Sequence, residues 1–121
     1  MPDARIDSKA KWNRTGIQVT AGTTYQLSAS GRWFDASHEC GPDGYDDPKL
    51  ARWVRLRRFP AARWFTLIGS IDGRNEFAIG NGLQWKAPAT GELRCYANDV
   101  GIMYWNNRGS VTLRVEPVGG R

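Results

Sequence analysis

The chain has 121 residues, and its 17 Lys and Arg against 12 Asp and Glu give a formal net charge of +5 at pH 7. This length fits one domain with a real core, for which six Trp, four Tyr and four Phe supply apolar material. Residues 1–11 contain no apolar run, and no later stretch is long enough to span a bilayer. We therefore expect no cleavable signal and no membrane span, so that the protein is cytoplasmic as synthesised and any export lacks a classical signal peptide.

Apolar and polar residues alternate over residues 16–20 and again over residues 25–33. Period-two alternation is typical of a half-buried strand. The second segment places these apolar side chains on one face: Tyr25, Leu27, Ala29 and Trp33. Residues 34–50 show no such period, are polar and acidic, and contain a predicted tight turn at residues 41–44.

An arginine-rich segment follows, with aromatic and aliphatic residues between the arginines. The arginines are Arg52, Arg55, Arg57, Arg58 and Arg63, and the residues between and after them include Trp53, Leu56, Phe59 and Trp64. The period leaves open whether this is a further strand or a strand with a short helical turn. Such a composition fits a nucleic-acid surface, but it also fits a solvated or partner-facing side, since arginine stems cover apolar surface. We favour the second interpretation, with no specific nucleic-acid binding, because no nucleic-acid motif accompanies the arginines.

The second half of the chain continues with short alternating segments and turns. The expected strands cover residues 64–69, 76–79, 83–86, 92–97 and 110–116. The first of these is apolar on both faces, as a central strand would be, and Asp72-Gly73 predicts a hairpin turn after it. About eight strands without any helical period predict an all-β fold, an antiparallel β-sandwich that forms a single domain over residues 1–121.

The two cysteines are too few for a disulfide scaffold and lack metal-type spacing. Cys95 is in phase with Leu93 and Ala97, so we expect it to point into the core. A bridge between Cys40 and Cys95 is left open, although the absent signal peptide counts against it.

Residues 98–109 join the last two expected strands and form an unusually long connection. The segment contains one carboxylate and three carboxamides, and such hard oxygen donors suit calcium better than zinc or copper. Asp99, Asn106 and Asn107 can supply side-chain oxygens, and a carbonyl near Met103 can supply another. Calcium takes about 6–8 oxygens, so this shell would leave positions for waters or ligand hydroxyls. The alternative is a turn whose Asn and Asp side chains cap their own backbone.

The same segment resembles the calcium loop of the LecA (PA-I)-type galactose-binding bacterial lectins. The resemblance lies in Asn98-Asp99-Val100, four variable positions and an aromatic step into Asn106-Asn107-Arg108-Gly109-Ser110. Other stretches match the family in the same order: Gly31 and Trp33, Gly41-Pro42-Asp43-Gly44, Asp47-Pro48, Gly82-Leu83, Trp85 and Ala87-Pro88. The resemblance implies a jelly-roll-like, galactose-binding-domain-like sandwich, Ca²⁺ as cofactor, galactose-like glycans as partners, and no catalysis. Self-association is left open.

The resemblance also implies which residues act. The implied metal ligands are Asp99, Met103, Asn106, Asn107 and Ala36, with Asp35 as an alternative to Ala36 because Arg32 interrupts the Gly-Trp pair. The implied sugar contacts are Asp99, Val100, Asn106, Asn107, Asp47 and Pro48. The chain offers Asp46 or Asp47 where the family has His, and Lys49 or Leu50 where it has Gln, which bears on galactose selectivity.

Two further alternatives concern the use of the remaining side chains. Tyr104 and Trp105 are candidates either for a sugar platform or for a core plug beneath the loop, and the single His38 is given no role.

An enzyme would need a carboxylate pair for glycoside hydrolysis, drawn from Asp43, Asp46, Asp47 and Asp99, but the sequence suggests neither a raised acid pKa nor a nucleophile motif. The alternative to a sugar-binding protein is a lectin-fold module that binds a protein or polyanion through the Arg52–Arg63 basic patch.

Overall fold

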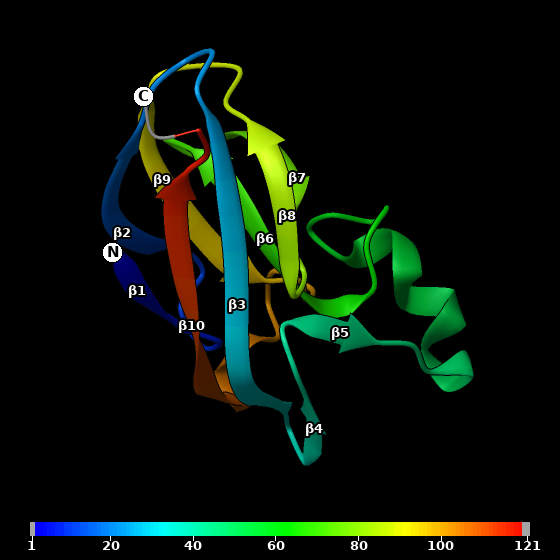
Figure 1. Cartoon of the computed structure of the whole chain (residues 1–121). Coiled ribbons are helices and arrows are strands. Elements are labelled where there is room, and N and C mark those ends of the chain that lie inside the picture. The colour runs from blue at the N-terminus through cyan, green and yellow to red at the C-terminus, as the bar shows by residue number, and fades with distance from the viewer. Residues whose placement is uncertain (1, 120–121) are drawn as a thin grey trace.

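The computed structural model describes residues 2–119 and shows two antiparallel sheets that pack against each other (Figure 1). The first sheet contains β1 (Asp3–Asp7), β10 (Asn107–Pro117), β3 (Thr24–Asp35) and β4 (His38–Cys40) in this order, with β8 (Gly82–Lys86) also paired to β3. The second contains β2 (Asn13–Val19), β9 (Gly91–Ala97), β6 (Trp64–Ile71) and β5 (Asp43–Tyr45), with β7 (Arg74–Ala78) also paired to β6. This confirms the predicted all-β, antiparallel sandwich.

The core lies between the two sheets and follows the predicted alternation. On β3, Tyr25, Leu27 and Trp33 are buried, as the sequence pattern requires. The Trp33 ring meets the Phe65 ring of β6 edge-on, with the centroids 5.7 Å apart. This contact joins the two sheets near the C-terminal end of β3 and the start of β6.

The two central strands of the second sheet are buried on both faces. This was expected for β6, but β9 was predicted to be half-buried and is not: Glu92 and Tyr96 on its outer side are buried as well. Groups from a distant part of the chain cover the outer side of β9, and the alternation within β9 does not reveal them. The Trp12 ring packs edge-on against Tyr96, and the Gly16 N–H donates to Glu92 Oε2 at 2.9 Å.

The acidic stretch at residues 34–50 contains more regular structure than the sequence indicated. β3 continues to Asp35, and β4 and β5 follow as strands of three residues each, too short to display a period. The predicted turn at residues 41–44 is present, with the Gly44 N–H donating to the Gly41 carbonyl at 3.1 Å. Gly44 has φ +77°, and a Cβ there would lie 2.2 Å from the Trp64 carbonyl oxygen, so only glycine fits.

The arginine-rich segment is neither of the two forms of strand that were predicted. It begins as a 3₁₀ helix, η1 (Pro48–Leu56), which projects from one side of the sandwich beyond β5 (Figure 1). The Asp47 side chain caps this helix by accepting the Lys49 N–H at 3.0 Å, and Pro48 occupies the first turn. Both residues favour a helix start, which explains the outcome.

The arginines do not form one solvated face either. Arg57 is buried, donates from Nη2 to the Pro60 carbonyl at 2.7 Å and lies over the Trp64 ring. Arg63 pairs with Asp46 at 3.3 Å, and Arg58 packs inward against aromatic rings. Arg52 and Arg55 on η1 are exposed. The predicted Arg52–Arg63 patch is therefore divided between the interior and the surface.

The remaining sequence expectations about turns and cysteines are answered directly. Asp72 and Gly73 have φ values of 53° and 83° in the hairpin between β6 and β7, which confirms that turn. Cys40 and Cys95 are both free and buried, so the structure contains no bridge between them, and Cys95 lies in the core as predicted. Among the described residues, no helix has the length and apolar character needed to cross a membrane.

Candidate functional site

The candidate residues meet at one end of the first sheet, where β3 ends and β10 begins. The strand register places Asp35 directly opposite Asn107, and the Ala36 N–H donates to the Asn106 carbonyl at 3.2 Å. Asn106 ends the short 3₁₀ helix η2 (Tyr104–Asn106), so β10 starts earlier than predicted and the connection is shorter than residues 98–109.

Two backbone contacts attach the preceding segment to the rest of the molecule. The Arg58 N–H donates to the Asp99 carbonyl at 3.0 Å, and Val100 forms a bridge with Arg57. The Met103 N–H then donates to the Val100 carbonyl at 2.9 Å and closes a turn. The side chains of Asp99 and Asn107, eight positions apart in the sequence, are thus held next to each other.

Unpaired oxygens distinguish this place from the rest of the described chain. Between residues 2 and 119, four buried side-chain atoms have no hydrogen-bond partner: Arg57 Nε, Asp99 Oδ2, Asn106 Oδ1 and Asn107 Oδ1. Three of these four are oxygens of the predicted metal ligands. A buried polar atom without a partner costs about 1–3 kcal/mol, and native proteins contain few of them. Three in one place indicate a site that needs a further positive or donating group.

The other atoms of these side chains hold them in position. Asp99 Oδ1 accepts the Val100 N–H at 2.7 Å, and Asn107 Nδ2 donates to the Ser8 carbonyl at 3.0 Å. A self-capping turn, the alternative weighed from the sequence, accounts for the first of these bonds. It does not account for the three oxygens that remain free.

A second carboxylate lies beside the first. Burial, with the nearby charge of Asp35 as the second cause, raises the pKa of Asp99 from 3.8 to about 7, and the Val100 N–H and the Asn107 amide oppose this shift. No feature of the sequence indicated a raised acid pKa, because the main cause is the burial of Asp99, which is 3% exposed. In the described part of the chain no salt bridge reaches Asp35 or Asp99. The site therefore concentrates negative charge without a protein cation.

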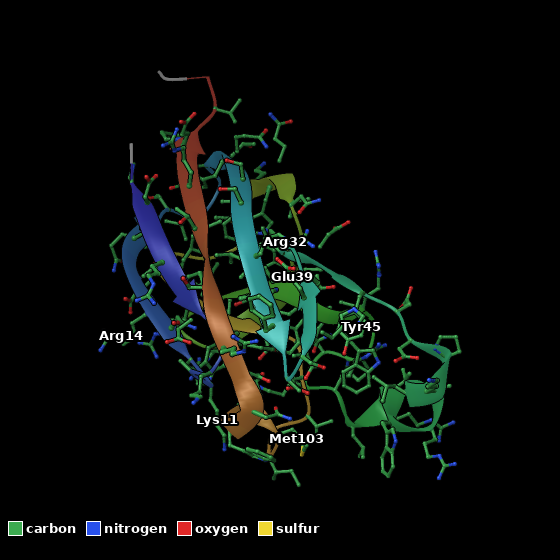
Figure 2. The ribbon with its side chains drawn as sticks, turned by 90° about the horizontal axis from the view of Figure 1, so that it is seen from below. Lys11, Arg14, Arg32, Glu39, Tyr45 and Met103 are labelled. Carbon is green, nitrogen blue, oxygen red and sulfur yellow. The ribbon has the colours of Figure 1, made fainter. Side chains whose placement is uncertain are left out.

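Tyr45 is a member of the site that the sequence did not reveal. Its hydroxyl donates to Asp35 Oδ2 at 2.5 Å, and burial followed by this bond raises the tyrosine pKa. The His38 ring stacks on Tyr45, with the centroids 3.8 Å apart. Tyr45 and Met103 lie on the side of the molecule from which η1 projects (Figure 2). No spacing in the sequence links Tyr45 to residues 98–107; the pairing of β5 with β6 brings it there.

The predicted sugar contacts are only partly assembled. Asp47 Oδ1 is used to cap η1, and neither Asp47 nor Pro48 lines the cavity next to Asp99, whereas Leu50 does. The Val100 N–H and carbonyl both bond within the protein, so its side chain is what faces the cavity. Asp47 and Leu50 are positions at which the sequence departs from the lectin family. The lining of the cavity differs accordingly, since Leu50 faces it and Asp47 does not.

The two aromatic residues of the loop take different positions. Tyr104 is buried, donates to the Ala97 carbonyl at 2.5 Å and accepts from Arg58 Nη1 at 3.0 Å, so it is the plug beneath the loop. Trp105 is 69% exposed. Of the acids considered for an enzyme, Asp43 and Asp46 both pair with Arg63, so they are not a free pair.

The donor set is one of carboxylates and carboxamides. Among residues 2–119, no three His, Cys, Asp or Glu side chains are grouped as metal ligands, so a metal here would depend on Asn and carbonyl oxygens too. The side-chain candidates are Asp35, Asp99, Asn106 and Asn107. Hard oxygen donors of this kind fit calcium and exclude a thiolate or imidazole metal centre.

The fold places the chain in a definite class, that of two-sheet antiparallel sandwiches found in lectins. A solved structure described as "EclA N-terminal domain; PllA-like lectin" matches 97% of this chain and 96% of its own, with a TM-score of 0.76 and 22% sequence identity. At this identity the likeness establishes the fold. No protein-family model and no curated protein matches the sequence.

Proposed function

We propose that the protein is a calcium-dependent lectin that binds galactose-like sugars and has no catalytic activity. The observation that carries the proposal is the group of three buried, unpaired oxygens on Asp99, Asn106 and Asn107. The lectin fold supports the sugar-binding part, and the donor set supports the calcium part.

The residues fit calcium in both charge and number. Asp99 and Asp35 supply two carboxylates against a doubly charged ion, and the pairing of Asp35 with Asn107 keeps them close. Asn106 and Asn107 add neutral oxygens, and the Ala36 and Met103 carbonyls are the backbone candidates. Because calcium takes about 6–8 oxygens, this set leaves room for a ligand's hydroxyls.

The bound ion would supply Lewis acidity toward two vicinal hydroxyls of the sugar. The protein's own part is to hold acceptors around those hydroxyls and to fix their direction. Asp99 and Asn106 are the acceptors we assign, because each has an oxygen that no protein donor uses. A cis-diol, as in galactose, presents two hydroxyls close enough to share one ion, and this is the basis of the proposed preference.

A glycan array probed in CaCl₂ and in chelator tests the proposal. We expect binding to terminal galactose in calcium and its loss in chelator. Asn106→Ala should also lose binding, whereas Asn81→Ala, which removes an exposed carboxamide outside the site, should keep it. Full sugar binding in chelator would contradict the calcium assignment, and incubation with the same glycans should release no reducing sugar.

A further inference from the structure

The helix η1 separates its charged and its apolar side chains onto different faces. A 3₁₀ helix has three residues per turn, so residues three apart in the sequence lie on the same face. One face carries exposed cations: Lys49, Arg52 and Arg55. Another carries large apolar residues that line the cavity next to Asp99: Leu50, Trp53 and Leu56. The helix is therefore amphipathic, with a row of positive charge beside a row of apolar side chains.

The protein supplies no acidic partner for this row of cations. Between residues 2 and 119, no salt bridge reaches Lys49, Arg52 or Arg55. The two carboxylates that precede the helix are used elsewhere, since Asp46 pairs with Arg63 and Asp47 caps η1. Uncompensated positive charge that faces solvent attracts an anionic partner.

Most of the exposed large apolar side chains in the described chain gather beside these cations. There are seven among residues 2–119, and five of them belong to η1 or to the segment 102–105: Trp53, Leu56, Ile102, Met103 and Trp105. The first four line the same cavity, so two segments that are distant in the sequence form one patch. Ile102 is 80% exposed, although it is one of the most apolar residues of the chain. Exposed apolar groups gathered in one place are typical of a binding surface.

We infer that η1 and the segment 102–105 together form a peripheral docking surface for a membrane that contains anionic phospholipids. A bilayer interface offers phosphate groups to the cations and acyl chains to the apolar residues, and tryptophan is enriched at such interfaces. A soluble polyanion would pair with the cations but would leave Ile102 and Trp105 in water. The helix η1 projects from the sandwich beyond β5, so it can reach a flat surface ahead of the strands (Figure 1).

This inference requires neither the calcium ion nor the sugar of the proposed function. Asp35 and Asp99 also line the cavity, but both are less exposed than the three cations. The side of the docking surface that faces solvent therefore carries positive charge even when no ion occupies the candidate site.

Sedimentation with sucrose-loaded vesicles in chelator tests the inference. One set of vesicles contains phosphatidylcholine alone, and the other contains phosphatidylcholine mixed with phosphatidylglycerol; neither contains a glycolipid. We expect binding to the mixed vesicles about tenfold tighter or more than to phosphatidylcholine, and weaker binding as salt is added. The chelator excludes a calcium bridge between lipid phosphate and the candidate site, and the lipid composition excludes binding through a sugar.

A charge variant assigns the binding to η1. We expect the double variant Arg52→Gln/Arg55→Gln to bind the mixed vesicles about tenfold more weakly or less tightly still, because two cations near an anionic surface are lost. The matched control is Arg74→Gln/Lys86→Gln, which removes two exposed cations at the opposite end of the sandwich, near the end of β6 and the start of β3. This control should bind as the wild type does.

An apolar variant assigns the insertion to the segment 102–105. Ile102→Ser should weaken binding several-fold, because less apolar area leaves water at the bilayer. Val118→Ser is the matched control, since Val118 is 41% exposed and its N–H donates to the Thr24 carbonyl at the far end of β3. Both side chains are exposed, so thermal unfolding should show the two variants to be as stable as the wild type.

Several results would overturn the inference and leave the proposed function intact. Absence of binding to the mixed vesicles would do so, and so would equal losses in the charge variant and its control. Binding that appears only in calcium would assign the contact to the candidate site. Retention on a heparin column without vesicle binding would assign the cations to a soluble polyanion, and self-association that Ile102→Ser abolishes would assign the patch to a second copy of the chain.

Discussion

Asn98 and the oxygens of the candidate site offer a direct comparison between two kinds of buried polar group. Asn98 Oδ1 accepts the Phe59 N–H at 3.0 Å, and Nδ2 donates to the carbonyls of Phe59, Ala62 and Arg63 at 2.8–3.1 Å. Its neighbour Asp99 keeps Oδ2 without a partner. Both residues are buried and adjacent in the sequence, yet one uses every polar atom on the protein's own backbone and the other does not.

This difference separates a structural role from a binding role. A carboxamide that pairs with four backbone groups fixes residues 59–63 against the loop and stabilises the fold. An unpaired oxygen in the same environment costs stability until a ligand meets it. Composition alone does not distinguish the two, because both are Asn or Asp in one loop.

The largest expected effect is that of Asn98→Ala. The substitution takes the side-chain partner from the Phe59 N–H and the Ala62 carbonyl, and it leaves the Phe59 and Arg63 carbonyls with only their backbone donors from Ala62 and Thr66. We therefore expect a loss on the order of 3 kcal/mol in the free energy of unfolding. Asn106→Ala, measured by urea unfolding in chelator, should cost much less because Asn106 Oδ1 has no partner to lose. The comparison fails if the two variants lose equal stability in chelator.

Asp99→Asn should reveal the cost of the unpaired carboxylate. The folded-state pKa of Asp99 is raised from 3.8 to about 7, so its contribution to stability is present at low pH and is lost as the pH rises through about 7. In chelator, the wild type should therefore lose on the order of 2–3 kcal/mol more than Asp99→Asn between pH 5 and pH 8. Urea unfolding at the two pH values measures this difference. Equal losses of stability in both proteins would contradict the raised pKa of Asp99.

Arg58→Lys tests the support beneath the loop. The Arg58 guanidinium lies 3.5 Å from the Tyr96 ring centroid and donates to the Tyr104 hydroxyl at 3.0 Å and the Lys11 carbonyl at 2.5 Å. A lysine retains the charge but cannot stack or donate in the same fork, so we expect a loss of about 1–2 kcal/mol. Thermal unfolding measures the loss, and a variant as stable as the wild type would mean that the charge alone suffices.

The smallest expected effect is that of Tyr45→Phe. The hydroxyl donates to Asp35 Oδ2, and its removal should cost about 0.5–1.5 kcal/mol in chelator. The freed Asp35 oxygen would become available to an ion, so we expect stabilisation by calcium to be retained. Unfolding with and without calcium measures both effects, and loss of the calcium effect would assign Tyr45 a direct part in the site.

The sequence predicted the sandwich because its strands are long enough to alternate, as β3 and β10 do. It did not predict β4 and β5, which have three residues each, or η1, whose start depends on a cap formed by Asp47. The group of Asp99, Asn106 and Asn107 was predicted from one loop. Tyr45 and the apolar wall of the cavity were not, because β5, η1 and the loop are separate in the sequence and meet only after the sheets have paired.

Calorimetric titration of the chelator-stripped protein with CaCl₂ measures whether the group of Asp99, Asn106 and Asn107 binds calcium. We expect saturable binding of one calcium ion per chain at or below about 1 mM, weakened in Asn107→Ala and unchanged in Asn81→Ala. No binding by the wild type at that concentration, or equal binding by Asn107→Ala, would contradict it.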